Sequence, residues 1–200
     1  MLSCGNLLHI LTRHATVLNL SPPSRKGLHS SDWTYNDNGS GDGLFENGLR
    51  KEMLKLLEPG SVVLDIGANI GLHSLFLANA GYKVHAFEPM HANFNLLKCS
   101  AVSFQRHHPP KPCPQQLWPR RQSHHNCIAN EDRNFGSARI QNDATSCAPE
   151  NTIQVRRLDD YLATNDVKPF LVKIDVEGYE FKALEPAKEY FGEPTKTHFR

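Results

Sequence analysis

An aspartate stands directly before a glycine-containing turn in the segment from Val62 to Gly71, which reads VVLDIGANIG. In open α/β proteins, such a turn after a buried strand usually receives a nucleotide phosphate. An ionised Asp65 about 4 Å from a phosphate charge would cost on the order of 4 kcal/mol at an effective dielectric constant near 20. The spacing Gly67-x-x-x-Gly71 also differs from the G-x-G-x-x-G pattern of dinucleotide sites. The turn therefore favours a ligand that is cationic at this point and disfavours NAD.

A second acid, Glu88, ends the next apolar segment, KVHAFE. An acid at the end of the second strand can accept hydrogen bonds from the ribose hydroxyls of an adenosine. S-adenosylmethionine carries an ammonium, a sulfonium and no phosphate, so Asp65 and Glu88 together indicate this cofactor. The alternative is that Glu88 is an acid favoured by the dipole of the helix that Pro89 opens.

Two more acids, Asp175 and Glu177, follow the apolar segment FLVK. A carboxylate at a strand end is a candidate general base, which takes a proton from the reacting group of a substrate, and we predict Asp175, or else Glu177, for this role. The alternative is that these acids cap the helix that begins near Gly178.

Alternating helical and strand patterns position the first two acids. Helices are predicted at 44–57, 71–80 and from Pro89 to about Leu97, and buried strands at 61–66 and 83–88. This alternation predicts an α/β fold whose parallel sheet has right-handed crossovers. Ligands bind beyond the carboxyl ends of the strands in such sheets, where the glycine-containing turn is expected.

The later segments complete the predicted sheet. NCIAN at 126–130 is predicted as a third parallel strand, and 135–141 and 152–157 as a small antiparallel pair. LDDYL predicts a helical turn, and the strand at 170–175 precedes an amphipathic helix that Pro186 kinks or breaks. In a doubly wound sheet the last strand lies beside the first, so Asp65 and Asp175 should emerge side by side.

Residues 102–126 interrupt this pattern with five prolines and almost no periodic apolar signal, which predicts an inserted loop. The region contains or adjoins side chains that can bind zinc, but the closely spaced ligand pairs of structural zinc sites are absent. We therefore predict no metal site. The side chains considered are His107, His108, Cys113, His124, His125 and Cys127.

Composition limits the classes of partner. The 200 residues, 39% of them hydrophobic, suit one domain, predicted at 44–200. The balance of 22 Lys and Arg against 21 Asp and Glu gives no reason to expect nucleic acid or a membrane surface, and no apolar run is long enough to span a membrane. Five widely spaced cysteines favour reduced thiols and an intracellular, preferably cytoplasmic, protein.

The first 43 residues are predicted to be an extension outside the domain. Residues 1–31 contain no acid and carry Arg13, Arg25 and Lys26, a composition compatible with an organelle-targeting peptide. The alternative is a disordered extension that ends in the turn-rich NDNGSGDG.

The ordered set of DIGANIG, FEP, LDDYL and LVKIDVEGYE closely resembles the FkbM family of S-adenosylmethionine-dependent methyltransferases. The resemblance covers about 44–191 without the insert. It implies a Rossmann-like class I methyltransferase sheet and methylation of hydroxyl groups on small molecules or sugars. It also implies a ribose contact from Glu88, an adenine-side contact near Asn130, and cofactor contacts from Asp65, Gly67, Ala68, Asn69 and Gly71.

The chain departs from the family pattern by the insert and by ending before the remaining strands of a class I sheet. We therefore expect a sheet truncated at its C-terminal side, with an unpaired edge beside the last strand. A catalytically impaired S-adenosylmethionine-binding module is the alternative function, distinguished by cofactor binding without methyl transfer. The sequence predicts neither the acceptor molecule nor the oligomeric state.

Overall fold

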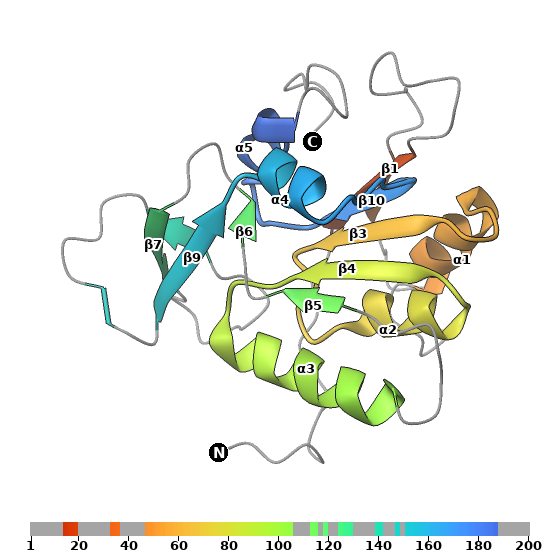
Figure 1. The fold of residues 1–200 in the computed structure, drawn as a ribbon, viewed down its shortest axis with the longest axis horizontal. Helices are drawn as coiled ribbons and strands as arrows, with labels where there is room; N and C mark the ends of the chain where they lie inside the picture. Colours follow the sequence, from red (N-terminus) through yellow and green to blue (C-terminus); the bar gives the residue numbers. More distant parts are fainter. Residues whose placement is uncertain are drawn as a thin grey trace.

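The computed structural model contains two β-sheets and five α-helices in the part of the chain that it describes (Figure 1). The described residues are 14–19, 33–36, 47–105, 113–115, 118–119, 124–129, 139–141, 147–148 and 151–187.

The larger sheet has six strands in the order β2-β1-β10-β3-β4-β5. Strands β10, β3, β4 and β5 run parallel, whereas β1 and β2 are antiparallel to their neighbours. The parallel sheet predicted from the alternating pattern is therefore confirmed. The strands are β1 (His14–Asn19), β2 (Trp33–Asn36), β3 (Val62–Ile66), β4 (Lys83–Phe87), β5 (Cys113–Gln115) and β10 (Leu171–Ile174).

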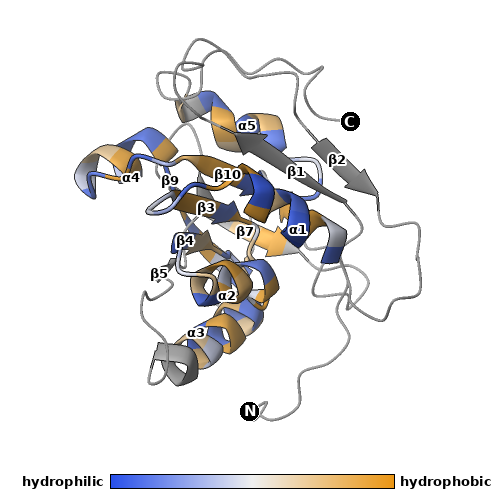
Figure 2. Ribbon diagram, turned by 90° about the vertical axis from the view of Figure 1, so that its right-hand side faces the viewer, coloured by the Kyte–Doolittle hydropathy of each residue, from blue (hydrophilic) through white to orange (hydrophobic). Residues whose placement is uncertain are grey.

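Helices cover both faces of this sheet (Figures 1 and 2). Successive side chains of a strand point to opposite faces, and the two core clusters follow this alternation. Val63 and Val84 pack with α1 and α2 on one face, whereas Leu64 and Val172 pack with α4 and α5 on the other. The helices are α1 (Asn47–Leu56), α2 (Leu72–Asn79), α3 (His91–Gln105), α4 (Leu158–Thr164) and α5 (Glu180–Leu184), which the 3-10 turn η2 (Glu185–Ala187) follows.

The central elements lie where the sequence predicts them. Strands β3, β4 and β10 are confirmed, and so are the helices after β3 and β4 and the helical turn at LDDYL. Helix α5 ends just before η2, which contains Pro186, because proline cannot continue the hydrogen-bond ladder of an α-helix.

The prediction of a third parallel strand at 126–130 is wrong. Strand β7 (His124–Ala129) belongs to the second sheet, which has the order β6-β9-β7-β8, and β5 takes the place beside β4. The predicted pairing of 135–141 with 152–157 is also wrong, because β7 lies between β8 and β9 and is antiparallel to both. The other strands of this sheet are β6 (Trp118–Pro119), β8 (Arg139–Gln141) and β9 (Thr152–Arg156).

The second sheet joins the main core through its apolar side chains. Ile128, Ile153 and Val155 belong to the same buried cluster as Ile66 and Phe87. Ile66 and Phe87 are the last residues of β3 and β4, so the second sheet packs near the edge where these parallel strands end.

The insert is shorter and more structured than the sequence predicts. Helix α3 continues to Gln105, and both β5 and β6 lie within 102–126, so the predicted loop from 102 to 126 is wrong for these segments. Of the zinc-capable side chains, His107 and His108 lie outside the described residues. Among the residues that are described, no group of three or more potential metal ligands is present.

The edge of the sheet beside β10 is occupied by strands from the first 43 residues. Strand β1 pairs with β10, with Thr16 opposite Ile174, and β2 pairs with β1. The expected unpaired edge beside the last strand is therefore wrong, and residues 14–19 and 33–36 are part of the sheet rather than of a separate extension. An organelle-targeting role for residues 1–31 stays a prediction.

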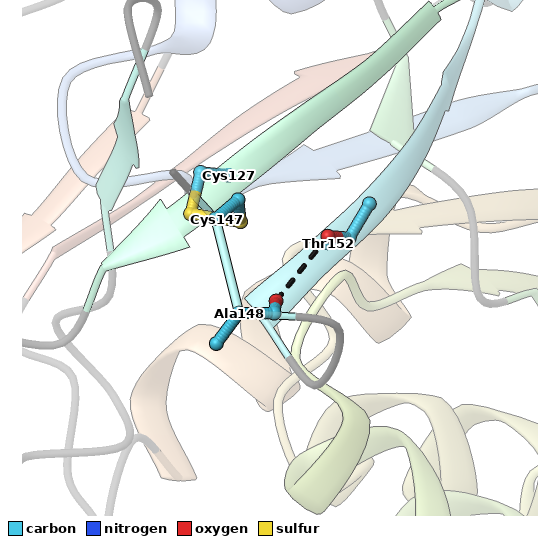
Figure 3. The surroundings of a disulfide bond; sticks show 4 residues. All are labelled: Cys127, Cys147, Ala148 and Thr152. Carbon is cyan, nitrogen blue, oxygen red and sulfur yellow. Dashed lines mark hydrogen bonds between the residues drawn. A yellow bond between two sulfur atoms is a disulfide. The ribbon is translucent and has the colours of Figure 1, made fainter. Parts of the chain in front are cut away.

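A disulfide joins Cys127 of β7 to Cys147, close to the point where Thr152 Oγ1 donates a hydrogen bond to Ala148 O at 3.2 Å (Figure 3). Cys99 is disulfide-bonded as well. The expectation of reduced thiols is therefore wrong for these three residues, and the inference of an intracellular location loses the observation on which it was based. No helix in the described residues is long and apolar enough to cross a membrane.

Candidate functional site

The ends of three neighbouring parallel strands meet at one edge of the sheet. Ile66, at the end of β3, lies opposite Phe87 of β4 and Ile174 of β10. The glycine-containing turn at 67–71 follows β3, Glu88 follows β4 and Asp175 follows β10. The predicted adjacency of the strands that carry Asp65 and Asp175 is confirmed.

Two glycines make the turn after β3 sterically feasible. Gly67 has φ 82°, and a Cβ atom there would lie 1.8 Å from the backbone oxygen of Asp175. Gly71 has φ 91°, and a Cβ atom there would lie 2.3 Å from Leu97 Cδ1 of α3. Both the positive φ angles and the close approaches require glycine. Gly71 directly precedes α2 and accepts the hydrogen bond from Leu75 N at 2.8 Å.

Backbone hydrogen bonds attach the turn to β4. Gly67 N and Ala68 N both donate to Phe87 O at 3.0 Å. Asn69 N donates to Glu88 Oε2 at 2.9 Å, and Asn69 has the unusual φ of 52° for a residue with a side chain. The turn therefore has a fixed position relative to the end of the neighbouring strand.

The Oδ1 atom of Asn69 is buried without a hydrogen-bond partner among the described residues. A buried acceptor that the protein leaves unpaired costs free energy, and such atoms often point to a bound ligand or an ordered water molecule. Asn69 Oδ1 is therefore a candidate acceptor for a hydrogen-bond donor of a ligand at this turn.

Glu88 is buried, with only 4% of its surface exposed. Burial raises the pKa of Glu88 from 4.5 to about 7, although the hydrogen bonds from Met90 N and Asn69 N and the charge of Lys173 oppose this shift. Each carboxyl oxygen accepts one backbone hydrogen bond and keeps a further lone pair for a ligand hydroxyl. Glu88 can therefore serve both of the roles considered from the sequence, since it binds Met90 N just before α3 and faces the turn.

Asp65 is completely buried and is neutralised inside the protein. Its Oδ2 accepts a hydrogen bond from Ser74 Oγ at 2.7 Å, and its Oδ1 lies 3.0 Å from Lys173 Nζ. Burial alone raises the pKa of Asp65, but the charges of Lys173 and His73 and the bond from Ser74 outweigh burial and hold the pKa below its ordinary value of 3.8. The argument that Asp65 offers a free negative charge to a cationic ligand therefore needs correction, because Asp65 forms an ion pair with Lys173 inside the protein.

Lys173 is the site residue that the sequence reasoning missed. Its side chain is 3% exposed, and its Nζ donates to Gly67 O at 2.8 Å and lies 3.9 Å from Asp175 Oδ2. A signal was present in the sequence, since a lysine within an otherwise apolar buried strand requires a charged partner. Register places Lys173 directly opposite Asp65 on the neighbouring strand.

The two candidate general bases differ in their surroundings. The side chain of Asp175 is 7% exposed, and its backbone N donates to Ile66 O at 2.9 Å. Glu177 is exposed and has φ 52° in the turn that leads to α5. Neither acid occupies the N-cap position of α5, which is Tyr179. The helix-capping alternative is therefore wrong for that position.

Asn130 lies outside the described residues. The strand before it, β7, belongs to the second sheet, so the prediction of an adenine contact at the end of a third parallel strand loses its structural basis. Strand β5 occupies the place beside β4 that the prediction assigned to this segment.

Comparison with known proteins agrees with the motifs at these strand ends. Residues 65–195 match the family model described as the methyltransferase FkbM domain. A 48-residue segment is 52% identical to the 31-O-demethyl-FK506 methyltransferase FkbM of Streptomyces tacrolimicus, and the match spans 23% of this chain and 18% of that protein. Since the domain model covers more than half of the chain, the protein belongs to the FkbM methyltransferase family.

Proposed function

We propose that this protein is an S-adenosylmethionine-dependent methyltransferase that methylates a hydroxyl group on a small molecule or sugar. The observation that carries the proposal is the buried Oδ1 of Asn69, which has no hydrogen-bond partner among the described residues. Asn69 lies in the glycine-containing turn, and its backbone N donates a hydrogen bond to the carboxyl group of Glu88. The name of the relative from Streptomyces tacrolimicus, a methyltransferase acting on a 31-O-demethyl compound, supports oxygen as the acceptor atom.

The residues at the turn fit the methyl donor. Gly67 and Gly71 allow the turn to pack directly against Asp175 O and Leu97, which fixes its position, and Asn69 supplies an acceptor for a donor group of the ligand. Glu88 keeps lone pairs for the two ribose hydroxyls. When bound, the cofactor supplies an electrophilic methyl group, and the protein binds and orients both reactants.

Proton removal from the acceptor hydroxyl is assigned to Asp175, with Glu177 as the alternative. Asp175 follows the strand next to the turn, and its carboxyl group lies 3.9 Å from the ammonium group of Lys173. Glu177 is two residues further along and is open to solvent. A base must come within hydrogen-bonding distance of the acceptor oxygen, and this requirement favours the residue closer to the turn.

Calorimetry tests the cofactor. Binding of S-adenosylhomocysteine without binding of NADH is the expected result, and the reverse would refute the proposal. Transfer of a labelled methyl group from S-adenosylmethionine to small hydroxyl compounds then tests the reaction. Binding without transfer to any acceptor would instead indicate the impaired binding module.

Variants test the base. Asp175→Asn should reduce methyl transfer at saturating cofactor by at least tenfold while S-adenosylhomocysteine affinity changes little. Asp166→Asn is a matched control, because Asp166 is exposed in the loop before β10 and its carboxylate forms a surface ion pair with Lys168. Full turnover in Asp175→Asn, together with a loss in Glu177→Gln, would assign the role to Glu177.

A further inference from the structure

We infer that Lys173 is a positioning residue that holds the first peptide of the cofactor turn in its binding geometry before any ligand arrives. The inference rests on the proposed function for the role of the turn. Lys173 lies at the centre of β10 and reaches across to β3, where its Nζ donates to Gly67 O at 2.8 Å.

The peptide group between Gly67 and Ala68 is held at both of its ends. A trans peptide is planar, and its C=O and N–H bonds point in opposite directions. Lys173 of β10 binds the carbonyl oxygen, while Phe87 O of β4 accepts the hydrogen bond from Ala68 N at 3.0 Å. The two strands that flank β3 therefore fix the orientation of this peptide from opposite sides.

This orientation determines where the ligand-facing atoms lie. The next amide, Asn69 N, donates to Glu88 Oε2, and the unpaired Oδ1 belongs to the same residue. A rotation of the Gly67–Ala68 peptide would displace both groups. A turn that is ordered before the ligand arrives lowers the free-energy cost of ordering it when the ligand binds.

The buried charges provide a competing, purely structural explanation. Lys173 also neutralises Asp65 at 3.0 Å and lies near Asp175 at 3.9 Å. Replacing Lys173 alone would leave Asp65 buried and without its counter-charge, which by itself destabilises a protein strongly. Lys173→Met is therefore expected to unfold at a much lower temperature, whichever explanation holds.

A pair of variants separates the two explanations. Asp65→Asn removes the charge that requires neutralisation but keeps the bond from Lys173 to Gly67 O, and Asp175 at 3.9 Å stays as the counter-charge of Lys173. The double variant Asp65→Asn/Lys173→Met removes that bond as well, and it leaves no unpaired charge at Asp65. Comparison of the double variant with Asp65→Asn thus reports the bond to the turn. Lys168→Met, at a lysine whose side chain is 79% exposed, is the control for the substitution itself.

Amide hydrogen exchange of the ligand-free proteins is the deciding measurement. We expect exchange in the segment 67–71 to be at least tenfold faster in the double variant than in Asp65→Asn, a factor equivalent to about 1.4 kcal/mol. The control should exchange as the wild type does. Equal exchange in the double variant and Asp65→Asn would overturn the positioning role.

Cofactor binding gives a second readout. Affinity for S-adenosylhomocysteine should fall at least tenfold from Asp65→Asn to the double variant, and equal affinities would contradict the inference. The exchange experiment needs no ligand, so it decides the role of Lys173 in the turn even if the wild type fails to bind S-adenosylhomocysteine. That failure would refute the proposed function separately.

Discussion

Replacing Gly67 by alanine should destabilise the protein and disrupt the cofactor turn. The added Cβ would lie 1.8 Å from the backbone oxygen of Asp175, whereas ordinary contacts begin near 3.4 Å. The turn and the end of β10 would have to separate by roughly 1.5 Å in a closely packed region. Alanine at a positive φ adds strain of about 1–2 kcal/mol, and the overlap adds about 1–3 kcal/mol.

Gly60→Ala is the matched control. Gly60 has the same φ of 82°, but an added Cβ would meet nothing within 4 Å. Both variants therefore carry the backbone strain, and only Gly67→Ala carries the overlap. The difference of about 1–3 kcal/mol corresponds to a further decrease of roughly 2–12 °C in the unfolding midpoint for a domain of this size.

Thermal unfolding followed by circular dichroism measures this difference, and calorimetry with S-adenosylhomocysteine measures the effect on the turn. We expect Gly67→Ala to bind at least tenfold more weakly than Gly60→Ala, because the overlap displaces the turn residues from their positions relative to Glu88. Equal unfolding midpoints and equal affinities in the two variants would refute the close approach as the reason for this glycine.

Three further predictions concern other groups. The pKa of Glu88 is about 7 in the folded protein and 4.5 ordinarily, so the folded protein binds the Glu88 proton more tightly than the unfolded chain does. The free energy of unfolding therefore falls as the pH rises from about 4.5 to 7. The unfolding midpoint of Glu88→Gln relative to the wild type should therefore rise between pH 5 and pH 8; an unchanged difference would contradict the shift. Tyr161→Phe should lower the free energy of unfolding by about 1–2 kcal/mol, measured with urea, because the Tyr161 hydroxyl lies 2.8 Å from His85 Nδ1 in the core. Alkylation followed by mass spectrometry should modify Cys127 and Cys147 only after reduction, and replacing both by serine should cost roughly 3 kcal/mol. Modification without reduction would show that the disulfide is not formed.

The centre of the fold could be predicted because its signals are local. The segments that form β3 and β4 are short apolar runs bounded by glycine or proline, and the helices that precede and follow these strands have apolar residues at helical spacing. The position of β10 beside β3 followed from the usual strand order of doubly wound sheets rather than from any local signal. One general rule thus placed Asp175 next to the turn.

The outer strands could not be predicted because long-range pairing decides them. Strand β5 consists of Cys-Pro-Gln, which has no apolar pattern, yet it pairs with β4. Strand β7 has a better strand signal but joins β8 and β9 instead. Strand β1 lies in a region whose composition resembles a targeting peptide, and its partner β10 is far along the chain.

The sequence predicted which residues lie at the candidate site more successfully than it predicted their charge interactions. Asp65, Glu88 and the glycines lie at the strand ends as expected, because parallel strands end at one edge of the sheet. The partner of Asp65 depends on the register of β3 against β10, which sets Lys173 opposite it. The register of two strands cannot be determined from the sequence of either strand alone, so the sequence did not predict that Lys173 neutralises Asp65.

The pairing of β1 with β10 has a consequence for synthesis of the chain on the ribosome. Thr16 and its partner Ile174 are more than 150 residues apart, so β1 is made long before the strand against which it packs. At roughly 5–20 residues per second, β1 waits on the order of ten to thirty seconds for that partner. During this interval its backbone donors and acceptors are available to other nascent chains, and a chaperone that shields extended segments should raise the yield of native protein.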